Sequence, residues 1–122
     1  MKHLYFLITL ALLISSCAST KTTPNPVVGS WDYKVYSTPN GDTAGTLVVT
    51  EVNGELSASF NNVDYGNSEV MKLVIEEGIL RGSIFVADMY MDIHLTFDQD
   101  SFSGTVGSLD VGVFEMDGKK SQ

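Results

Sequence analysis

Gly29-Ser30-Trp31-Asp32-Tyr33-Lys34-Val35 is the stretch that decides the fold, and it contains the only tryptophan of the chain. Alternate residues of an extended strand point to the same face, so Trp31, Tyr33 and Val35 share one face. The residues between them are polar on the opposite face. We therefore predict that a strand over 30–37 opens an antiparallel sheet, with the Trp31 indole filling one end of its interior.

The rest of the chain repeats this pattern of short alternating strands separated by turn residues. No stretch after residue 29 has a convincing helical pattern. Asn53-Gly54 is the strongest signal for a two-residue type I′ hairpin turn. Turns are also expected at Pro39-Asn40-Gly41-Asp42 and at Glu77-Gly78. The expected strands cover about 30–37, 44–51, 56–60, 68–76, 79–86, 89–98, 102–106 and 109–116.

Three of the expected hairpins share a short motif in which a large apolar residue is followed, two positions later, by a small one. The pairs are Leu56 with Ala58, Leu80 with Gly82, and Phe102 with Gly104. Small residues at such positions let strands bend and let facing side chains fit a curved interior. We therefore predict an all-β, eight-stranded antiparallel up-and-down barrel, because closure removes both exposed edges of the sheet. The alternative is a two-sheet β-sandwich.

The N-terminus has the features of an export signal. Lys2 and His3 precede the uncharged run 4–14, which has the length of a signal core and is too short to span a bilayer as a helix. The following Ile14-Ser15-Ser16-Cys17 resembles the lipobox of bacterial lipoprotein signals. This resemblance implies export, cleavage before Cys17 and a diacylglyceryl thioether on that cysteine. The alternative is a plain secretory signal with an incidental cysteine.

The predicted organisation is a signal peptide over 1–16, a lipidated flexible tether over 17–28, a β-barrel domain over 29–117 and a polar tail over 118–122. The tether is rich in Ser and Thr and contains Pro24 and Pro26, which favour an extended segment. Ala18-Ser19 lacks an acidic residue after the cysteine. By the enterobacterial sorting rule this resembles an outer-membrane lipoprotein, so we expect a cell-envelope location.

The mature chain is strongly acidic. Cleavage before Cys17 would leave 106 of the 122 residues and remove one of the seven Lys and Arg but none of the 15 Asp and Glu, so the formal charge becomes −9. Such a surface argues against nucleic acid and against electrostatic docking to anionic lipid. It suits a basic protein partner.

A second resemblance concerns the barrel itself. Gly29-Ser30-Trp31 resembles the Gly-x-Trp opening of lipocalin-like and avidin-like barrels. The segments 45–49 and 101–106 are similar to small bacterial all-β domains, found alone or appended to secreted hydrolases. The resemblance implies a barrel and, in some members, an apolar ligand, which makes Trp31 a candidate ligand-binding residue.

Methionine and aromatic side chains on the expected inward faces are further candidates for lining a ligand cavity, because Met adapts to irregular ligands. Met91, Phe97 and Phe102 join Trp31 as the candidate ligand-binding residues. Met71, Met89, Met116 and Phe60 belong to the same group. The alternative is that these side chains fill a small barrel solidly.

No catalytic constellation is recognisable, so we do not expect an enzyme. Lipidation would consume Cys17, and His94 is the only histidine of the mature chain. Asp92 and His94 share one strand face, but a metal site needs three or four ligands, and an outward polar face that keeps the strand soluble is the better explanation of the pair. We expect no cofactor and no metal.

Two functions follow from these observations. The first is a lipid-anchored cell-envelope barrel that binds a small apolar ligand. The second is a periplasmic interaction module or inhibitor of a basic secreted hydrolase, since lysozyme- and protease-inhibiting lipoproteins are also small barrels. The expected contact regions of the second are 61–67 and 39–42.

Overall fold

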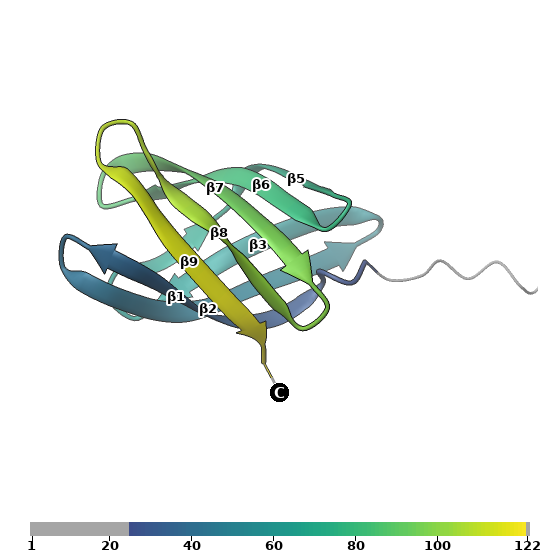
Figure 1. Cartoon of the computed structure of the whole chain (residues 1–122). Coiled ribbons are helices and arrows are strands. Elements are labelled where there is room, and N and C mark those ends of the chain that lie inside the picture. The colour runs from purple at the N-terminus through teal and green to yellow at the C-terminus, as the bar shows by residue number, and fades with distance from the viewer. Residues whose placement is uncertain (1–24, 122) are drawn as a thin grey trace, which may run out of the picture.

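The structure is a computed structural model that describes residues 25–121 and contains nine strands in that range (Figure 1). The predicted signal peptide, Cys17 and most of the predicted tether lie outside the described residues. Within 25–121 no helix is long and apolar enough to cross a membrane. The strands are β1 (Gly29–Thr38), β2 (Gly41–Val52), β3 (Glu55–Asn62), β4 (Gly66–Glu69), β5 (Met71–Glu76), β6 (Ile79–Val86), β7 (Met89–Asp98), β8 (Ser101–Ser108) and β9 (Gly112–Lys120).

All strand pairs are antiparallel, in the order β4-β3-β2-β1-β9-β8-β7-β6-β5. The first strand, β1, lies between β2 and β9, so the two ends of the described chain are neighbours in the sheet. The sheet curls into a nearly closed barrel, and Figure 1 shows β9 crossing in front of the strands behind it. The predicted all-β barrel is therefore confirmed over the β-sandwich alternative.

The ninth strand arises where the barrel closes. The expected strand over 68–76 is divided at Val70 into β4, which pairs with β3, and β5, which pairs with β6. At the division, the Val70 amide donates a hydrogen bond of 2.9 Å to the carbonyl of Ala58. Just beyond it, Lys72 has a φ of 53° and the register shifts, which marks a β-bulge. One bent segment therefore joins both free edges of the sheet, and we call this place the seam.

Local turn chemistry sets most of the hairpins. Asn53 and Gly54 have φ values of 54° and 81°, as a type I′ turn requires, so this prediction is confirmed. Glu77-Gly78 has the same geometry, with φ values of 52° and 77°. Ala87-Asp88 also adopts it, although neither residue is a glycine and the turn carries no sequence signal of that kind.

The C-terminal predictions need correction. Residues 109–111 form the turn between β8 and β9 rather than the start of a strand, and Leu109 is fully exposed there. The predicted polar tail over 118–122 is wrong, because β9 continues to Lys120. Its last residues pair with β1, Gly118 opposite Tyr33 and Lys120 opposite Trp31. Polar residues extend the strand here because β1 supplies backbone partners for them.

The tether also ends earlier than predicted. Val27 is 1% exposed, and its carbonyl accepts a hydrogen bond of 3.0 Å from the Trp31 indole Nε1. The described chain is therefore already part of the core two residues before β1 begins.

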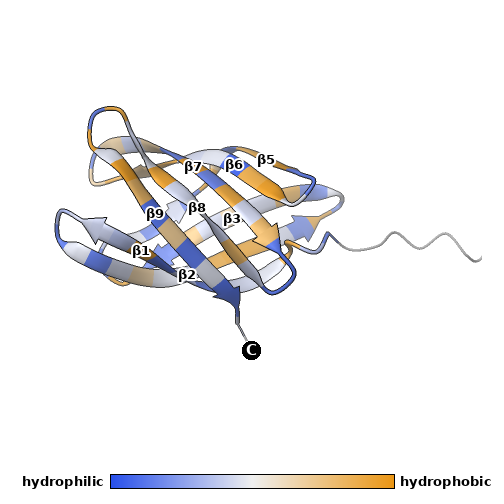
Figure 2. Ribbon diagram, viewed as in Figure 1, coloured by the Kyte–Doolittle hydropathy of each residue, from blue (hydrophilic) through white to orange (hydrophobic). Residues whose placement is uncertain are grey.

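The strands alternate as the sequence predicts, and Figure 2 shows hydrophobic and hydrophilic residues alternating along them. In β6, whose register the sequence leaves ambiguous, Leu80 and Ile84 point inward and Phe85 points outward. The inward side chains form one core, made up of Val27, Trp31, Tyr33, Val35, Leu47, Val49, Ala58, Phe60, Leu80, Ile84, Ile93, Leu95, Phe102, Val106 and Met116.

Candidate functional site

One end of the barrel interior is filled by aromatic side chains. Trp31 is fully buried, and its ring centroid lies 4.8 Å from that of Phe97 and 5.9 Å from that of Phe102, both in edge-to-face geometry. The Lys120 Nζ lies 5.3 Å from the Trp31 ring centroid. We call the cluster of Trp31, Phe97 and Phe102 the plug. It confirms the prediction that the indole fills one end of the interior.

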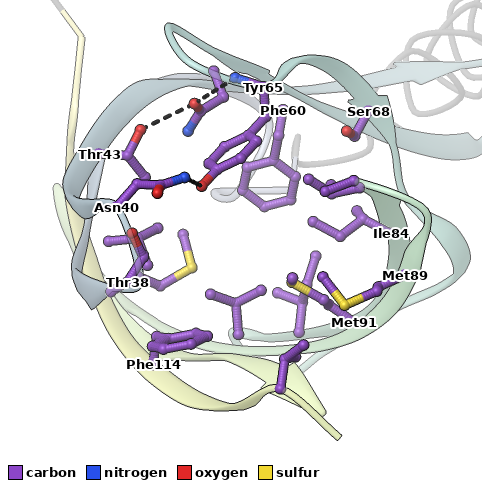
Figure 3. Close-up of a pocket in the computed structure, with 18 of the residues that line it drawn as sticks. Thr38, Asn40, Thr43, Phe60, Tyr65, Ser68, Ile84, Met89, Met91 and Phe114 are labelled. Carbon is purple, nitrogen blue, oxygen red and sulfur yellow. Dashed lines mark hydrogen bonds between the residues drawn. The ribbon is translucent and has the colours of Figure 1, made fainter.

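The other end is hollow. A cavity of about 270 Å³ opens there, and Figure 3 shows its lining side chains arranged in a ring around open space. The turns β1–β2, β3–β4, β6–β7 and β8–β9 surround its opening, which we call the mouth. The lining residues are Tyr33, Val35, Thr38, Pro39, Asn40, Thr43, Phe60, Asn62, Tyr65, Ser68, Ile84, Val86, Ala87, Met89, Met91, Ile93, Val106, Val111, Phe114 and Met116.

The predicted ligand-binding residues separate between the two ends. Met91 lines the cavity, as do Met89, Met116 and Phe60 from the wider group. Trp31, Phe97 and Phe102 do not line it, and this part of the prediction is corrected. They point inward as expected, but the barrel register places them in the plug. Met71, also in the wider group, points outward from β5 and is 37% exposed.

Several lining residues were not singled out from the sequence. Tyr33 and Val106 come from strands whose alternation marks them as inward-facing, so that signal is available for them, whereas the alternation around Ile84 on β6 is ambiguous. Asn62 lies outside the expected strand over 56–60, but it is the last residue of β3 and lines the cavity. Its role follows from hydrogen bonds between distant segments, which no local pattern reveals.

Asn62 organises the polar side of the mouth. Its Oδ1 accepts hydrogen bonds from the backbone amides of Asp64, at 2.8 Å, and Tyr65, at 3.1 Å, which fixes the β3–β4 turn. Its Nδ2 donates to the Tyr33 hydroxyl at 3.0 Å. The Thr43 hydroxyl lies 3.0 Å from Asn62 Oδ1 and 2.5 Å from Asp64 Oδ2, so these two acceptors share its hydrogen. A single side chain thereby connects β1, β2 and the β3–β4 turn.

A second contact joins two turns across the rim. The Asn40 Nδ2 donates to the Tyr65 hydroxyl at 3.1 Å, as the dashed line in Figure 3 shows. The β1–β2 and β3–β4 turns are thus tied together on one side of the opening.

The cavity has two chemically different walls. The residues that β1 to β4 and their turns contribute include every polar side chain of the lining: Tyr33, Thr38, Asn40, Thr43, Asn62, Tyr65 and Ser68. We call these seven residues the polar wall. The residues from β6 to β9 and their turns are all apolar, and we call them the apolar wall: Ile84, Val86, Ala87, Met89, Met91, Ile93, Val106, Val111, Phe114 and Met116.

Burial and charge further define the site. Burial raises the pKa of the Tyr33 hydroxyl above its usual value of 10.0, and the hydrogen bond from Asn62 offsets this only in part. The lining includes no charged side chain. Asp64, an exposed residue of the β3–β4 turn, accepts from Thr43 and is the acidic residue tied to this network.

The residues considered for a metal lie on the outside of the barrel. Asp92 and His94 are exposed on β7, and the Ser83 hydroxyl donates to Asp92 Oδ1 at 3.1 Å. Among residues 25–121, no three His, Cys, Asp or Glu side chains are grouped closely enough to hold a metal ion.

No protein-family model matches the chain, and no curated protein sequence matches it. Its fold is similar to solved structures of designed barrels. A redesigned β-barrel aligns with a TM-score of 0.59 and 13% identity over 80% of this chain and 93% of the other. A de novo designed fluorescence-activating β-barrel aligns with a TM-score of 0.52 and 15% identity, over 77% of this chain and 93% of the other. A redesigned β-barrel bound to DFHBI aligns with a TM-score of 0.54 and 12% identity, over 79% of this chain and 100% of the other. These similarities bear on the fold alone.

Proposed function

We propose that this protein binds a small apolar molecule in the cavity at the mouth of its barrel. The observation that carries the proposal is the contrast between the two ends, one filled by the plug and the other hollow. An apolar cavity of about 150 Å³ holds one benzene molecule. At about 270 Å³, this cavity suits a molecule of two fused rings or a comparable hydrocarbon chain.

The character of the lining supports this role. Three methionines, Met89, Met91 and Met116, contribute to it, and their flexible thioether chains adapt to ligands of irregular shape. A small barrel needs no hollow for stability, because side chains can fill the whole interior of a barrel of this size. The similar designed barrel bound to DFHBI holds a small organic molecule, which is consistent with ligand binding by this architecture.

We further propose that the protein is anchored by lipid at Cys17 to the cell envelope, on an outer membrane. The basis is the signal sequence. The described chain enters the barrel at the plug, through Val27, and its last strand ends beside Trp31. An anchor ahead of Val27 would therefore hold the plug end toward the membrane and leave the mouth facing away from it.

Membrane fractionation tests the anchor. We expect the full chain to be recovered with the membranes, and Cys17→Ser to be released into the soluble envelope fraction. Recovery of both forms in the soluble fraction would contradict lipid anchoring and would leave the cavity proposal in place.

A fluorescent probe tests the cavity. All nine strands and the described core lie within 25–121, so we expect a fragment beginning at residue 25 to fold. The neutral probe N-phenyl-1-naphthylamine should gain fluorescence on binding to it. Val106→Phe places a larger side chain on the cavity lining and should weaken binding by roughly fivefold or more, since overpacking costs about 1–3 kcal/mol.

Val113→Phe is the matched control, because Val113 lies on β9 and is 64% exposed on the outer surface. It should bind the probe as the parent does. Equal loss in both variants, or no binding by the parent fragment, would refute the cavity proposal. The second outcome would favour the interaction role suggested by the acidic composition.

A further inference from the structure

The two walls of the cavity favour different chemical groups on a ligand. Against the apolar wall, any polar group would lose its hydrogen bonds to water without replacement, at a cost of about 1–3 kcal/mol. Hydrogen-bonding groups face the cavity only from the side of β1 to β4. A ligand that fits both walls therefore has an apolar body and polarity confined to one edge.

Tyr33 is the most buried of the polar residues that line the cavity. Its side chain is 6% exposed, and its hydroxyl oxygen accepts from Asn62 Nδ2 at 3.0 Å. Within residues 25–121, no acceptor is in position for the hydroxyl hydrogen itself. Because burial raises the pKa of this phenol, the hydrogen stays in place at neutral pH. Tyr33 thus offers one unused hydrogen-bond donor inside an apolar cavity.

Most of the neighbouring hydroxyls are engaged or compete with water. The Thr43 hydroxyl hydrogen goes to Asp64 and Asn62. The Thr38 hydroxyl donates to the carbonyl of Gly41. Tyr65 lies at the rim and is 37% exposed, so water competes for its hydroxyl. Ser68 is the remaining hydroxyl of the polar wall, and its substitution serves as a comparison below.

The lining also restricts the charge of the ligand. An ionised carboxylate in the cavity would find no cationic side chain on the lining, and the polar network includes an acidic residue, Asp64, but no basic one. An unpaired buried charge is strongly disfavoured. The site therefore selects against free fatty acids and other organic anions.

We propose, building on the ligand-binding role above, that the natural ligand is a neutral molecule of about two-ring size with one hydrogen-bond acceptor, such as a ketone, aldehyde or ester carbonyl. The acceptor takes the hydrogen of the Tyr33 hydroxyl, which Asn62 orients from behind. The rest of the molecule lies against the apolar wall.

Three naphthalene derivatives of similar size test this specificity on the fragment that begins at residue 25. They are 2-acetylnaphthalene, which carries the acceptor, 2-ethylnaphthalene, which lacks it, and 2-naphthoate, which is charged. Calorimetry or displacement of N-phenyl-1-naphthylamine gives each affinity. We expect 2-naphthoate to bind at least about tenfold more weakly than 2-acetylnaphthalene at neutral pH.

Tyr33→Phe removes only the hydroxyl. It should lower the ratio of ketone to hydrocarbon affinity by roughly 2- to 12-fold, which is the fold-change of one net hydrogen bond. Tyr36→Phe is the matched control, because Tyr36 is on the same strand and its hydroxyl bonds to Asp117 on the outside of the barrel. The control should keep the parent ratio.

Each outcome separates the two proposals. If 2-ethylnaphthalene binds but Tyr33→Phe leaves the ratio unchanged, or Ser68→Ala lowers it instead, the acceptor is not held by Tyr33 and this inference is wrong while ligand binding stands. If none of the three binds, both fail. Should Tyr33→Phe not fold, the carbonyl stretching band of 2-acetylnaphthalene bound to the parent decides. A band at lower frequency than in hydrocarbon solvent supports the hydrogen bond, and an unshifted band refutes it.

Discussion

Replacing Gly82 by alanine should loosen the seam of the barrel. A Cβ built on Gly82 lies 2.4 Å from Val70 Cγ1 and 2.9 Å from the Met71 carbonyl oxygen. Ordinary Cβ contacts begin at 3.4 Å, so the new methyl group must displace the Val70 side chain by about 1 Å and the backbone at Met71 by about half that. The atoms that must move belong to the segment that joins the two free edges of the sheet.

The size of the effect follows from two opposing terms. Overpacking of this kind costs about 1–3 kcal/mol. Replacing glycine by alanine recovers about 0.4–1 kcal/mol, because it reduces the entropy of the unfolded chain. We therefore expect Gly82→Ala to lower the free energy of unfolding by about 1.5 kcal/mol. For a domain of this length that corresponds to a Tm lower by roughly 6–12 °C.

Urea unfolding of the fragment beginning at residue 25, followed by Trp31 fluorescence, measures the change. The midpoint should fall by about 0.5–1.5 M at constant slope. Val70→Ala removes the nearest clashing atom, so Gly82→Ala should cost about half as much or less in that background. A midpoint that does not fall, or an equal cost in both backgrounds, would show that Val70 and Gly82 do not pack as described.

Two further perturbations probe the plug and the polar wall. Trp31→Phe deletes the indole donor to the Val27 carbonyl and makes the plug smaller. The free energy of unfolding, measured by circular dichroism, should therefore fall by about 1–3 kcal/mol. An unchanged free energy would show that the plug does not stabilise the barrel. The raised pKa of Tyr33 adds stability that is complete below pH 10 and is lost as pH rises through the higher folded-state pKa. The stability difference between the parent and Tyr33→Phe should therefore be constant from pH 7 to 9 and shrink above pH 10, and a difference that grows there would reverse the sign of this argument.

Local signals account for the features that the sequence predicts correctly. Asn53-Gly54 and Glu77-Gly78 set their turns through their own backbone preferences, independently of distant residues. Alternation likewise identifies which side chains point inward, as for Trp31, Leu95 and Phe102. The barrel class follows because these signals recur along the whole domain.

The errors come from interactions between segments that are distant in the sequence. The strand over 68–76 looks continuous, but its two halves pair with β3 and β6, which lie on opposite sides of the seam. Residues 118–120 look like a tail because they are polar, yet β1 offers them backbone partners. A polar strand end of this kind cannot be recognised without knowing its neighbour.

The candidate site was predicted least well, for a related reason. Alternation shows that Trp31, Phe97 and Met91 all face the interior, but not how far along the barrel axis each one lies. That depth depends on the register between strands, which places the first two in the plug and Met91 in the cavity. The hydrogen bonds of Asn62 to Tyr33 and Thr43 depend on the same register.

The position of the seam within the sheet has a consequence for motion. Strands β1 and β9 lie inside the strand order, and each pairs with a neighbour on both sides, whereas β4 and β5 each pair on one side only and share one short segment at the far side of the ring. Amide hydrogens of β4 and β5 should therefore exchange with solvent sooner than those of β1 and β9. Transient opening of the seam would widen the barrel for a larger ligand, while β1 and β9, which lie at the two ends of the described chain, stay rigid.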